Sequence, residues 1–356
     1  MNRIVLIGNG FDLAHKLPTS YKDFINWYWD YRLRGLIDNQ ASVSEDILCK
    51  MTCFDKIWTG AIFFDYELKN SYGINIYNHL KSNKKKYKVE LSPLFERIMS
   101  SVETKGWVDI ENEYYTLLVL LHSHVKDNYL NHNKQLEYLR DLLVEYLSKI
   151  DYDKILKVNE DIKNNVYRRL DPWNDYSFGD IDKYRSDPSY DMLENVMLLS
   201  FNYTKTPELY KEDGTVVNYI HGKLDNPQSI IFGYGDELDE GYKKLIGKND
   251  NECLRNIKSI KYLESDRYRE VLRFIESKPF QILIMGHSCG NSDRTLLNTL
   301  FEHRNCISIK PYYYIKEDGT DNYLELVQNI SRNFTDMKLM RDRVVNKTYC
   351  KTLTDK

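Results

Sequence analysis

Apolar residues form short continuous runs near the two ends of the chain and helical stripes in its middle. Residues 3–7, Arg-Ile-Val-Leu-Ile, predict a buried parallel strand that leads directly into a glycine-rich turn. Thr19 or Ser20 is expected to cap the next helix, because apolar side chains within residues 21–29 recur at helical spacing. The chain therefore opens with a strand, a glycine turn and a helix.

The middle of the chain follows a helical pattern. Leucines between residues 136 and 147 recur on one face of a helix, and the basic run at 84–88 is interpreted as a solvated turn. Asp109 is expected to cap a helix rather than to take part in catalysis. We expect residues 35–190 to form a helical insertion that acts as a lid, a sensor or an interface of a homo-oligomer.

Strand patterns return after residue 190. Strands are expected at residues 195–203, 215–221, 229–233, 280–285 and 306–314, with a helix at 292–302. Strands that alternate with helices and end in glycines predict an α/β fold, with a Rossmann-like, doubly wound, mostly parallel sheet. This sheet domain would comprise residues 1–34 and 191–356. Such sheets bind ligands outside the carboxyl ends of their strands.

Composition narrows the class of protein. The 356 residues include 53 acidic and 50 basic ones, a formal charge of -3, so no overall positive field attracts nucleic acid or anionic lipid. The apolar runs are too short to span a bilayer, and the N-terminus lacks the pattern of a signal peptide. Six scattered cysteines indicate reduced thiols rather than disulfides or a zinc site. We expect a cytoplasmic protein without a metal, a membrane or nucleic acid as partner.

The first candidate segment for chemistry follows the first predicted strand. It consists of Gly8, Asn9, Gly10, Phe11 and Asp12. Between a strand and a helix, backbone N–H groups of such a loop can hold a phosphate. The alternative is an ordinary tight turn.

Two further candidates lie at the ends of later strands. Asn202 and Thr204 follow the apolar run 198–201, where Asn202 is suited to orient a ribose hydroxyl or a water; the alternative is a turn asparagine. His221 precedes Gly222 at the end of another strand. An imidazole that titrates near neutral pH is the usual general base, so His221 is the candidate base, with a structural histidine as the alternative.

The fourth candidate is the segment 286–290, Gly-His-Ser-Cys-Gly, which supports two interpretations. As a nucleophile elbow it would make Ser288 a nucleophile. The only histidine downstream is His303, and it shares a helix with Asp293, the only intervening aspartate, so a serine hydrolase is disfavoured. As a second nucleotide-facing turn, it would place Ser288 on a ribose or phosphate, with Asp293 capping the next helix or holding a hydroxyl.

In chain order these strings resemble the bacteriophage abortive infection family AbiH over almost the whole chain. The strings are Gly-Asn-Gly-Phe-Asp at 8–12, Leu-Pro-Thr at 17–19, Phe-Asn-Tyr-Thr at 201–204, His-Gly at 221–222 and Gly-His-Ser at 286–288 with Asp293. The family is similar, more distantly, to the sirtuin-like NAD-binding fold. The cysteine module that binds zinc in deacylating sirtuins is missing, so protein deacylation is not expected.

The resemblance implies an anti-phage enzyme that hydrolyses NAD to nicotinamide and ADP-ribose. Asn202 would position the nicotinamide ribose or a water, and His221 would act as the base, with cleavage through an oxocarbenium-like state. The glycine loop would bind the pyrophosphate. The remaining cofactor-binding positions would be Thr19, Thr204, Gly286, Ser288 and Asp293.

Two other functions remain open at this point. A nucleotide-binding sensor that oligomerises without chemistry predicts binding but no product. A serine hydrolase predicts that Ser288 reacts with a fluorophosphonate probe. A phage-derived trigger is expected to be a further partner if the enzyme is latent.

Overall fold

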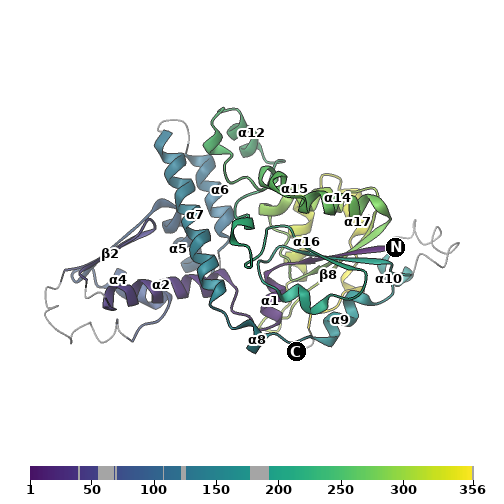
Figure 1. Ribbon diagram of the computed structural model, residues 1–356, viewed down its shortest axis with the longest axis horizontal. Coiled ribbons are helices and arrows are strands. Elements are labelled where there is room, and N and C mark those ends of the chain that lie inside the picture. The colour runs from purple at the N-terminus through teal and green to yellow at the C-terminus, as the bar shows by residue number, and fades with distance from the viewer. Residues whose placement is uncertain are drawn as a thin grey trace. The chain divides into compact units, whose positions relative to one another are not determined.

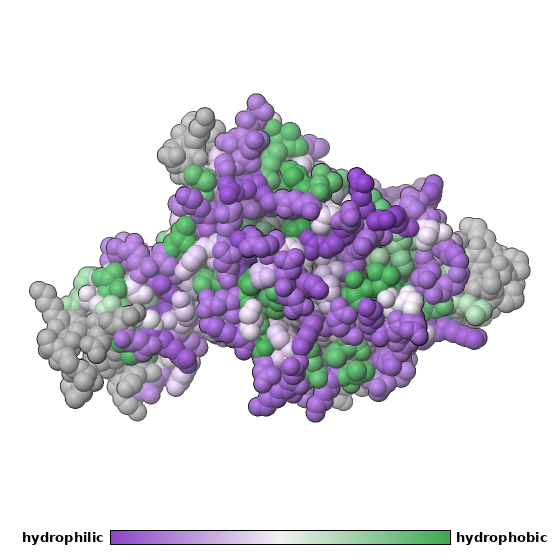
Figure 2. All heavy atoms as spheres, viewed as in Figure 1, coloured by the Kyte–Doolittle hydropathy of each residue, from purple (hydrophilic) through white to green (hydrophobic). Residues whose placement is uncertain are grey.

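The computed structural model describes residues 1–38, 41–54, 68, 70–106, 108–121, 126–176 and 192–354. Its contacts group the chain into two compact units (Figure 1). The first unit comprises Met1–Pro18, Ile150–Asp250 and Asn256–Lys356, and the second comprises Thr19–Lys149 and Asn251–Arg255. No helix in these ranges is long and apolar enough to cross a membrane. On the face drawn in Figure 2, hydrophilic side chains predominate and hydrophobic ones form scattered patches.

A parallel sheet forms the centre of the first unit. Its strands are β1 (Asn2–Ile7), β5 (Asn195–Ser200), β6 (Thr215–Tyr219), β7 (Phe280–Met285) and β8 (Cys306–Tyr312). They pair in the order β6-β5-β1-β7-β8, and every pair is parallel. The chain builds the sheet outwards from β1 to β6 and then places β7 and β8 on the other side of β1. The predicted α/β fold with a mostly parallel sheet is confirmed.

Helices cover both faces of this sheet. Ile4 and Leu6 belong to one buried cluster with side chains of helices at 267–277, 294–301 and 323–332. Val5 and Ile7 belong to another with side chains of helices at 9–14 and 160–167. Because both faces are buried, residues 4–7 of β1 are apolar without alternation. The helices of this unit are α1 (Asn9–Ala14), α8 (Tyr152–Ile155), α9 (Glu160–Tyr167), α10 (Pro172–Asp175), α12 (Glu240–Ile246), α13 (Lys258–Lys261), α14 (Arg267–Ser277), α15 (Arg294–Phe301), α16 (Tyr323–Arg332) and α17 (Met337–Arg343).

One predicted strand is wrong. Residues 229–233 were expected to form a strand, but a 3-10 turn at Pro227–Ser229 leads into irregular chain. Ile231 is buried, yet its N–H donates to the carbonyl of His221 at 2.8 Å instead of joining a ladder. Burial in a loop and burial in a strand select the same apolar residues, which explains the error.

The second unit contains helices and a small antiparallel sheet. Its helices are α2 (Tyr21–Asp38), α4 (Ile74–Ser82), α5 (Pro93–Lys105), α6 (Ile110–Leu120) and α7 (Lys126–Ser148). Its strands are β2 (Val43–Glu45), β3 (Cys49–Cys53) and β4 (Tyr87–Leu91), in the order β2-β3-β4. The long helix expected over 136–147 is confirmed, but the expectation of an all-helical middle missed this sheet. Helices α8, α9 and α10, which lie within 35–190, group with the first unit.

Two predicted caps can be checked in the second unit. The Ser20 hydroxyl accepts a hydrogen bond from the N–H of Asp23 at 3.1 Å, and the Asp23 carboxylate accepts one from the N–H of Ser20 at 3.2 Å. This reciprocal pair starts α2. The Asp109 carboxylate accepts from the N–H of Asn112 at 3.0 Å, which confirms Asp109 as the cap of α6.

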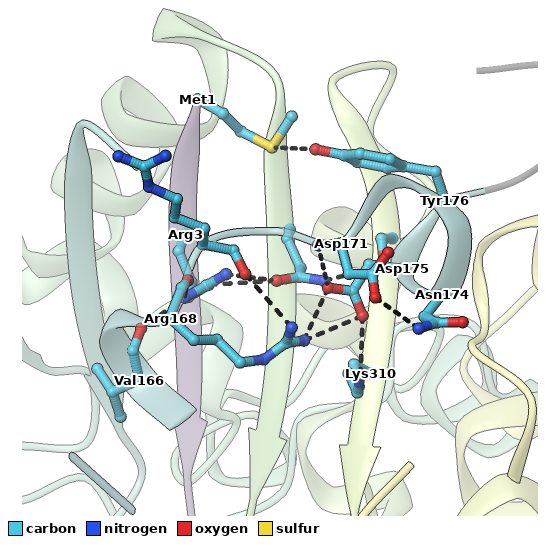
Figure 3. A network of polar contacts seen from close by, with 12 residues as sticks. Met1, Arg3, Val166, Arg168, Asp171, Asn174, Asp175, Tyr176 and Lys310 are labelled. Atoms are coloured by element: carbon cyan, nitrogen blue, oxygen red, sulfur yellow. Dashed lines mark hydrogen bonds and ion pairs between the residues drawn. The ribbon is translucent and has the colours of Figure 1, made fainter. Parts of the chain in front are cut away.

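A buried network of charges ties α9 and α10 to the sheet (Figure 3). The guanidinium of Arg3 donates to the carbonyls of Val166 and Arg168 at 2.7 and 2.8 Å, and to the Gln281 side chain at 2.9 Å. The carboxylate of Asp175 pairs with Lys310 at 2.8 Å and with Arg168 at 2.7 Å. Burial lowers the pKa of Arg3 to about 10, with a further contribution from Arg168. We call these side chains, Arg3, Arg168, Asp175, Gln281 and Lys310, the Asp175 network.

Candidate functional site

The carboxyl ends of four parallel strands bring the candidate residues to one edge of the sheet. Ile7 pairs with Ser200, and Ser200 pairs with Tyr219, so β1, β5 and β6 end level with one another. Leu6 pairs with Ile284, which brings the end of β7 to the same edge. The segments that follow these strands contain the glycine loop, Asn202, His221 and the turn at residues 286–290. The structure therefore gathers the strand-end candidates at one place within the first unit.

The two glycine turns pack directly against each other. A Cβ atom added to Gly8 would lie 2.5 Å from Cα of His287, and one added to Gly10 would lie 2.9 Å from Cα of Gly286. Gly286 has φ +76°, and its Cβ would lie 2.0 Å from the nitrogen of Phe11. At all three positions the approach of two backbones excludes any side chain.

The backbone donors of the glycine loop are largely used by this packing. The N–H of Gly10 donates to the carbonyl of Gly286 at 2.8 Å, and the N–H of Phe11 donates to the carbonyl of Gly8 at 2.9 Å. The loop is not an open turn but passes into α1, with Gly8 as the N-cap. Asn9 is exposed on this helix, whereas Phe11 is buried with its ring centroid 5.4 Å from that of Tyr210.

Asn202 holds the glycine loop in place. Its side-chain amide donates to the carbonyl of Gly8 at 2.9 Å, and its own N–H donates to the hydroxyl of Ser200 at 3.2 Å. The side chain is therefore fixed at the end of β5, immediately beside the end of β1. Its predicted role toward a ribose or a water stays a prediction.

Asp12 contributes a buried carboxyl group next to Asn202. Oδ2 of Asp12 accepts a hydrogen bond from the hydroxyl of Thr204 at 2.8 Å, and Thr204 lies 3.2 Å from the hydroxyl of Thr206. Within the described ranges, Oδ1 of Asp12 is buried without a hydrogen-bond partner. Burial raises the pKa of Asp12 to about 6, and its hydrogen bonds to Thr206, Thr204 and Asn202 limit the rise. Asp12 can thus change protonation near neutral pH.

A second buried carboxylate, Asp293, collects three nitrogen groups. The ammonium of Lys258 lies 2.8 Å from Oδ1, and Nε2 of His221 lies 3.2 Å from the same oxygen. Nε2 of His287 lies 3.5 Å from Oδ2. Nε2 of His221 also lies 3.1 Å from the hydroxyl of Tyr262. We call these five residues the Asp293 cluster.

The ring of Phe201 packs on both histidines of the cluster. Its centroid lies 5.3 Å from that of His221, with the rings nearly perpendicular, and 4.1 Å from that of His287. The five members of the cluster are all buried. The low polarity of these surroundings makes each charge sensitive to its neighbours.

The electrostatics of the cluster keep Asp293 ionised and His221 neutral. Burial alone would raise the pKa of Asp293, but Lys258 and the two histidines outweigh burial and hold it well below its usual range. Burial, and after it the positive charge of Lys258, lower the pKa of His221 to about 4, although Asp293 acts in the opposite direction. His221 is therefore uncharged and able to accept a proton at neutral pH.

The turn after β7 does not have the geometry of a nucleophile elbow. Ser288 is exposed, and within the described part of the chain no hydrogen bond links its side chain to a histidine. The strained residue is Cys289, with φ 54°, not the serine. His303 instead lies 3.2 Å from Glu276. These contacts provide no base for Ser288.

Asp293 and Thr19, the two remaining candidates, lie in different units of the chain. Asp293 precedes α15 but forms no side-chain cap; its carboxylate pairs with Lys258 instead. Thr19 belongs to the second unit, where it is buried.

Comparison with protein families identifies the chain. The model of the family described as bacteriophage abortive infection AbiH matches residues 4–314. The chain belongs to the AbiH family. No curated protein matches the chain. The match covers every residue of the Asp293 cluster and both glycine turns, and it associates the protein with abortive infection by bacteriophage.

Three members of the site in this AbiH protein were not predicted. His287 lies inside the quoted string Gly-His-Ser, but no role was assigned to it. Lys258 and Tyr262 lie in a lysine-rich segment with no motif. Lys258 is fully buried in the structure, and only tertiary packing shows this. Lys258 lies far from Asp293 in the sequence, so no motif could have indicated that the two side chains meet in the folded protein.

Proposed function

We propose that this AbiH protein binds NAD at the carboxyl ends of β1, β5, β6 and β7 and hydrolyses it to nicotinamide and ADP-ribose. The observation that carries the proposal is the convergence of Asn202, His221 and Asp293 beside the two glycine turns. The strand order supports it, because the chain adds strands on one side of β1 up to β6 and then on the other side from β7, so the winding order of this parallel sheet reverses between β1 and β7. Open α/β sheets bind nucleotides at such a switch point. Depletion of NAD would account for abortive infection.

In the proposed reaction His221 acts as a general base. A water attacks the anomeric carbon of the nicotinamide ribose, and its proton moves to the neutral imidazole. The bond from this carbon to the pyridinium nitrogen breaks, and its electron pair neutralises the nicotinamide ring. The products are nicotinamide, ADP-ribose and one proton. The low pKa of His221 makes it a weak base, which suits a dissociative reaction in which the leaving group departs early.

The glycine turns constrain how the dinucleotide binds in this proposal. Since the N–H groups of Gly10 and Phe11 donate within the protein, they are not the groups that bind the pyrophosphate. The proposal places the pyrophosphate on the outer side of the loop, next to the exposed Asn9 and Ser288. Asn202 fixes the loop from behind through the carbonyl of Gly8.

Burial of the reacting groups supports a latent enzyme. The exposed fractions are 3% for His221 and 8% for Asn202. A nucleotide must reach both side chains, so we propose that the described state is closed and that a trigger produced during infection opens it. A conformational step of this kind commonly limits access to enzyme active sites.

The test is to incubate the full-length protein with NAD and to separate nicotinamide and ADP-ribose by chromatography. The assay is run with purified protein and in lysate from phage-infected cells. Wild type is expected to release nicotinamide in at least the lysate, whereas His221→Ala and Asn202→Ala release at least 100-fold less, a typical contribution of a positioned acid or base. His303→Ala is the matched control, because this histidine contacts Glu276 and not the cluster.

Two results would contradict the proposal. One is turnover in His221→Ala equal to that of wild type. The other is the absence of nicotinamide release in infected lysate. NAD binding without product in that lysate would favour the nucleotide sensor instead.

A further inference from the structure

The carboxylate of Asp293 is surrounded by donors on both of its oxygens. Oδ1 receives Lys258 and His221, and Oδ2 faces His287. The donors come from α13, from the segment after β6 and from the turn after β7, respectively. Side chains from three separate segments therefore contact the same carboxylate.

The hydrogen bonds determine which nitrogen of each imidazole carries the proton. Nδ1 of His287 accepts from the N–H of Cys289 at 3.0 Å, so its proton is on Nε2, toward Asp293. An ionised Asp293 can only accept hydrogen bonds, so Nε2 of His221 carries the proton that faces it. In neutral His221 the lone pair is then on Nδ1. No described residue forms a hydrogen bond to this nitrogen.

We propose that Lys258 and Asp293 are positioning residues that hold His221 in one neutral tautomer, with Nδ1 as the basic nitrogen. Asp293 orients the ring by accepting from Nε2. Lys258 keeps Asp293 ionised and opposes a second positive charge on His221. The functional meaning of this arrangement rests on the proposed role of His221 as the base, but the arrangement itself does not.

The groups that face His221 act in two directions. Lys258 from α13 and His287 from the turn after β7 disfavour a protonated His221, whereas Asp293 from the 3-10 turn Asn291–Asp293 favours it. Tyr262, from the 3-10 turn Tyr262–Glu264, contributes a neutral hydroxyl. Phe201 contributes an apolar ring. Lys258 is the only fixed positive charge among these groups, so it is the decisive residue to change.

The first experiment reads the tautomer directly. Full-length protein labelled with nitrogen-15 in its eight histidines is studied by NMR, and His221 is assigned from the signal lost in His221→Gln. We expect a neutral ring with its proton on Nε2 at neutral pH, and a titration midpoint well below the usual value of about 6.5. A proton on Nδ1, or a midpoint near 6.5, would overturn the proposal.

The second experiment removes the charge of Lys258. In Lys258→Met the midpoint of His221 is expected to rise by about one unit or more, since a neighbouring charge moves a pKa by roughly 1–3 units. Lys258→Arg keeps the charge and should restore a low midpoint. Lys261→Met is the matched control on the same helix, because Lys261 pairs with Glu264 at 2.9 Å. An unchanged midpoint in folded Lys258→Met contradicts the proposal.

The NMR readout separates this inference from the proposed function. If nicotinamide is released, the acid limb of its pH profile should shift with the midpoint of His221 in Lys258→Met. If the tautomer and the shift are found but no NAD is cleaved, the positioning stands and the proposed reaction is wrong. If Lys258→Met does not fold, the wild-type tautomer and the Lys258→Arg midpoint still decide the question.

Discussion

The Asp175 network and the Asp293 cluster both bury a carboxylate in the first unit, but they differ in what surrounds it. Asp175 pairs with Lys310 and Arg168, and no histidine in the described part of the chain contacts it. Asp293 pairs with one lysine and two histidines, and the neutral imidazole of His221 can accept a proton. The first arrangement holds elements together, and the second can also move a proton.

The Asp175 network and the Asp293 cluster also differ in where they lie along the strands of the sheet. Arg3 and Gln281, which belong to the Asp175 network, lie near the amino ends of β1 and β7. The Asp293 cluster lies beyond the carboxyl ends, where α/β sheets bind ligands. In our proposal, two features distinguish the Asp293 cluster from the Asp175 network. They are its position at the carboxyl edge and a neutral imidazole that can accept a proton.

The largest effect on stability is predicted for Asp175→Asn. This change leaves Lys310 and Arg168 without their buried counter-charge, and breaking a buried pair costs about 3–5 kcal/mol. Urea unfolding measures the change. Asp153→Asn, in the exposed pair with Lys205, is the control and should cost far less stability, because water screens an exposed ion pair. Equal losses in the two variants would show that the network contributes nothing by being buried.

A somewhat smaller loss is predicted for Gly286→Ala at the carboxyl edge. The new Cβ would lie 2.0 Å from the nitrogen of Phe11 and would force the two glycine turns apart. The positive φ adds strain to this clash, so we expect the free energy of unfolding to fall by about 3 kcal/mol. Gly319→Ala has a similar φ of +83° but no atom within 4 Å, so it should lose only about 1 kcal/mol. Matching losses would mean that the contact between the turns is not needed for stability.

The pH dependence of stability distinguishes the two carboxyl-edge groups. The pKa of Asp12 is raised to about 6, so folding favours its protonated form, and this contribution is lost as the pH rises from about 4 to above 6. Relative to wild type, Asp12→Asn should gain about 2–3 kcal/mol between pH 4 and pH 7, at about 1.4 kcal/mol per unit.

His221 is predicted to act in the opposite direction over the same pH range. Its pKa is lowered to about 4, so its contribution is present above about 6.5 and is lost as the pH falls. His221→Gln should therefore gain stability relative to wild type toward pH 4. Parallel pH profiles of Asp12→Asn and His221→Gln would contradict both assignments. Urea unfolding at several pH values provides the measurement.

The smallest effect is predicted for Ser288→Ala. The side chain is exposed, so stability should change by less than about 0.5 kcal/mol. Nicotinamide release should fall only a few-fold, as expected for a contact that binds substrate. A complete loss of activity, together with labelling of wild type by a fluorophosphonate, would revive the serine hydrolase.

The sequence predicted the centre of the sheet well because β1, β5 and β7 are buried along nearly their whole length and contain continuous apolar runs. It failed at 229–233, where a buried loop has the same composition, and at β2, β3 and β4, which are short and carry polar residues. His221 and Asn202 were chosen as candidates because they lie just after strands, and the structure places both at the carboxyl edge of the sheet. Lys258 was not predicted, because its burial arises from tertiary packing; an added Cβ on Gly235, for example, would lie 3.1 Å from the Cβ of Lys258.

The most direct test of the central claim compares one variant from each region in the same assay. Nicotinamide release in infected-cell lysate is measured for Asp175→Asn and His221→Gln, with the rate expressed per folded molecule. We predict that Asp175→Asn keeps the wild-type rate within a few-fold despite its lower stability, whereas His221→Gln loses at least 100-fold with little loss of stability. Equal rates in the two variants would contradict the assignment of function to the carboxyl edge.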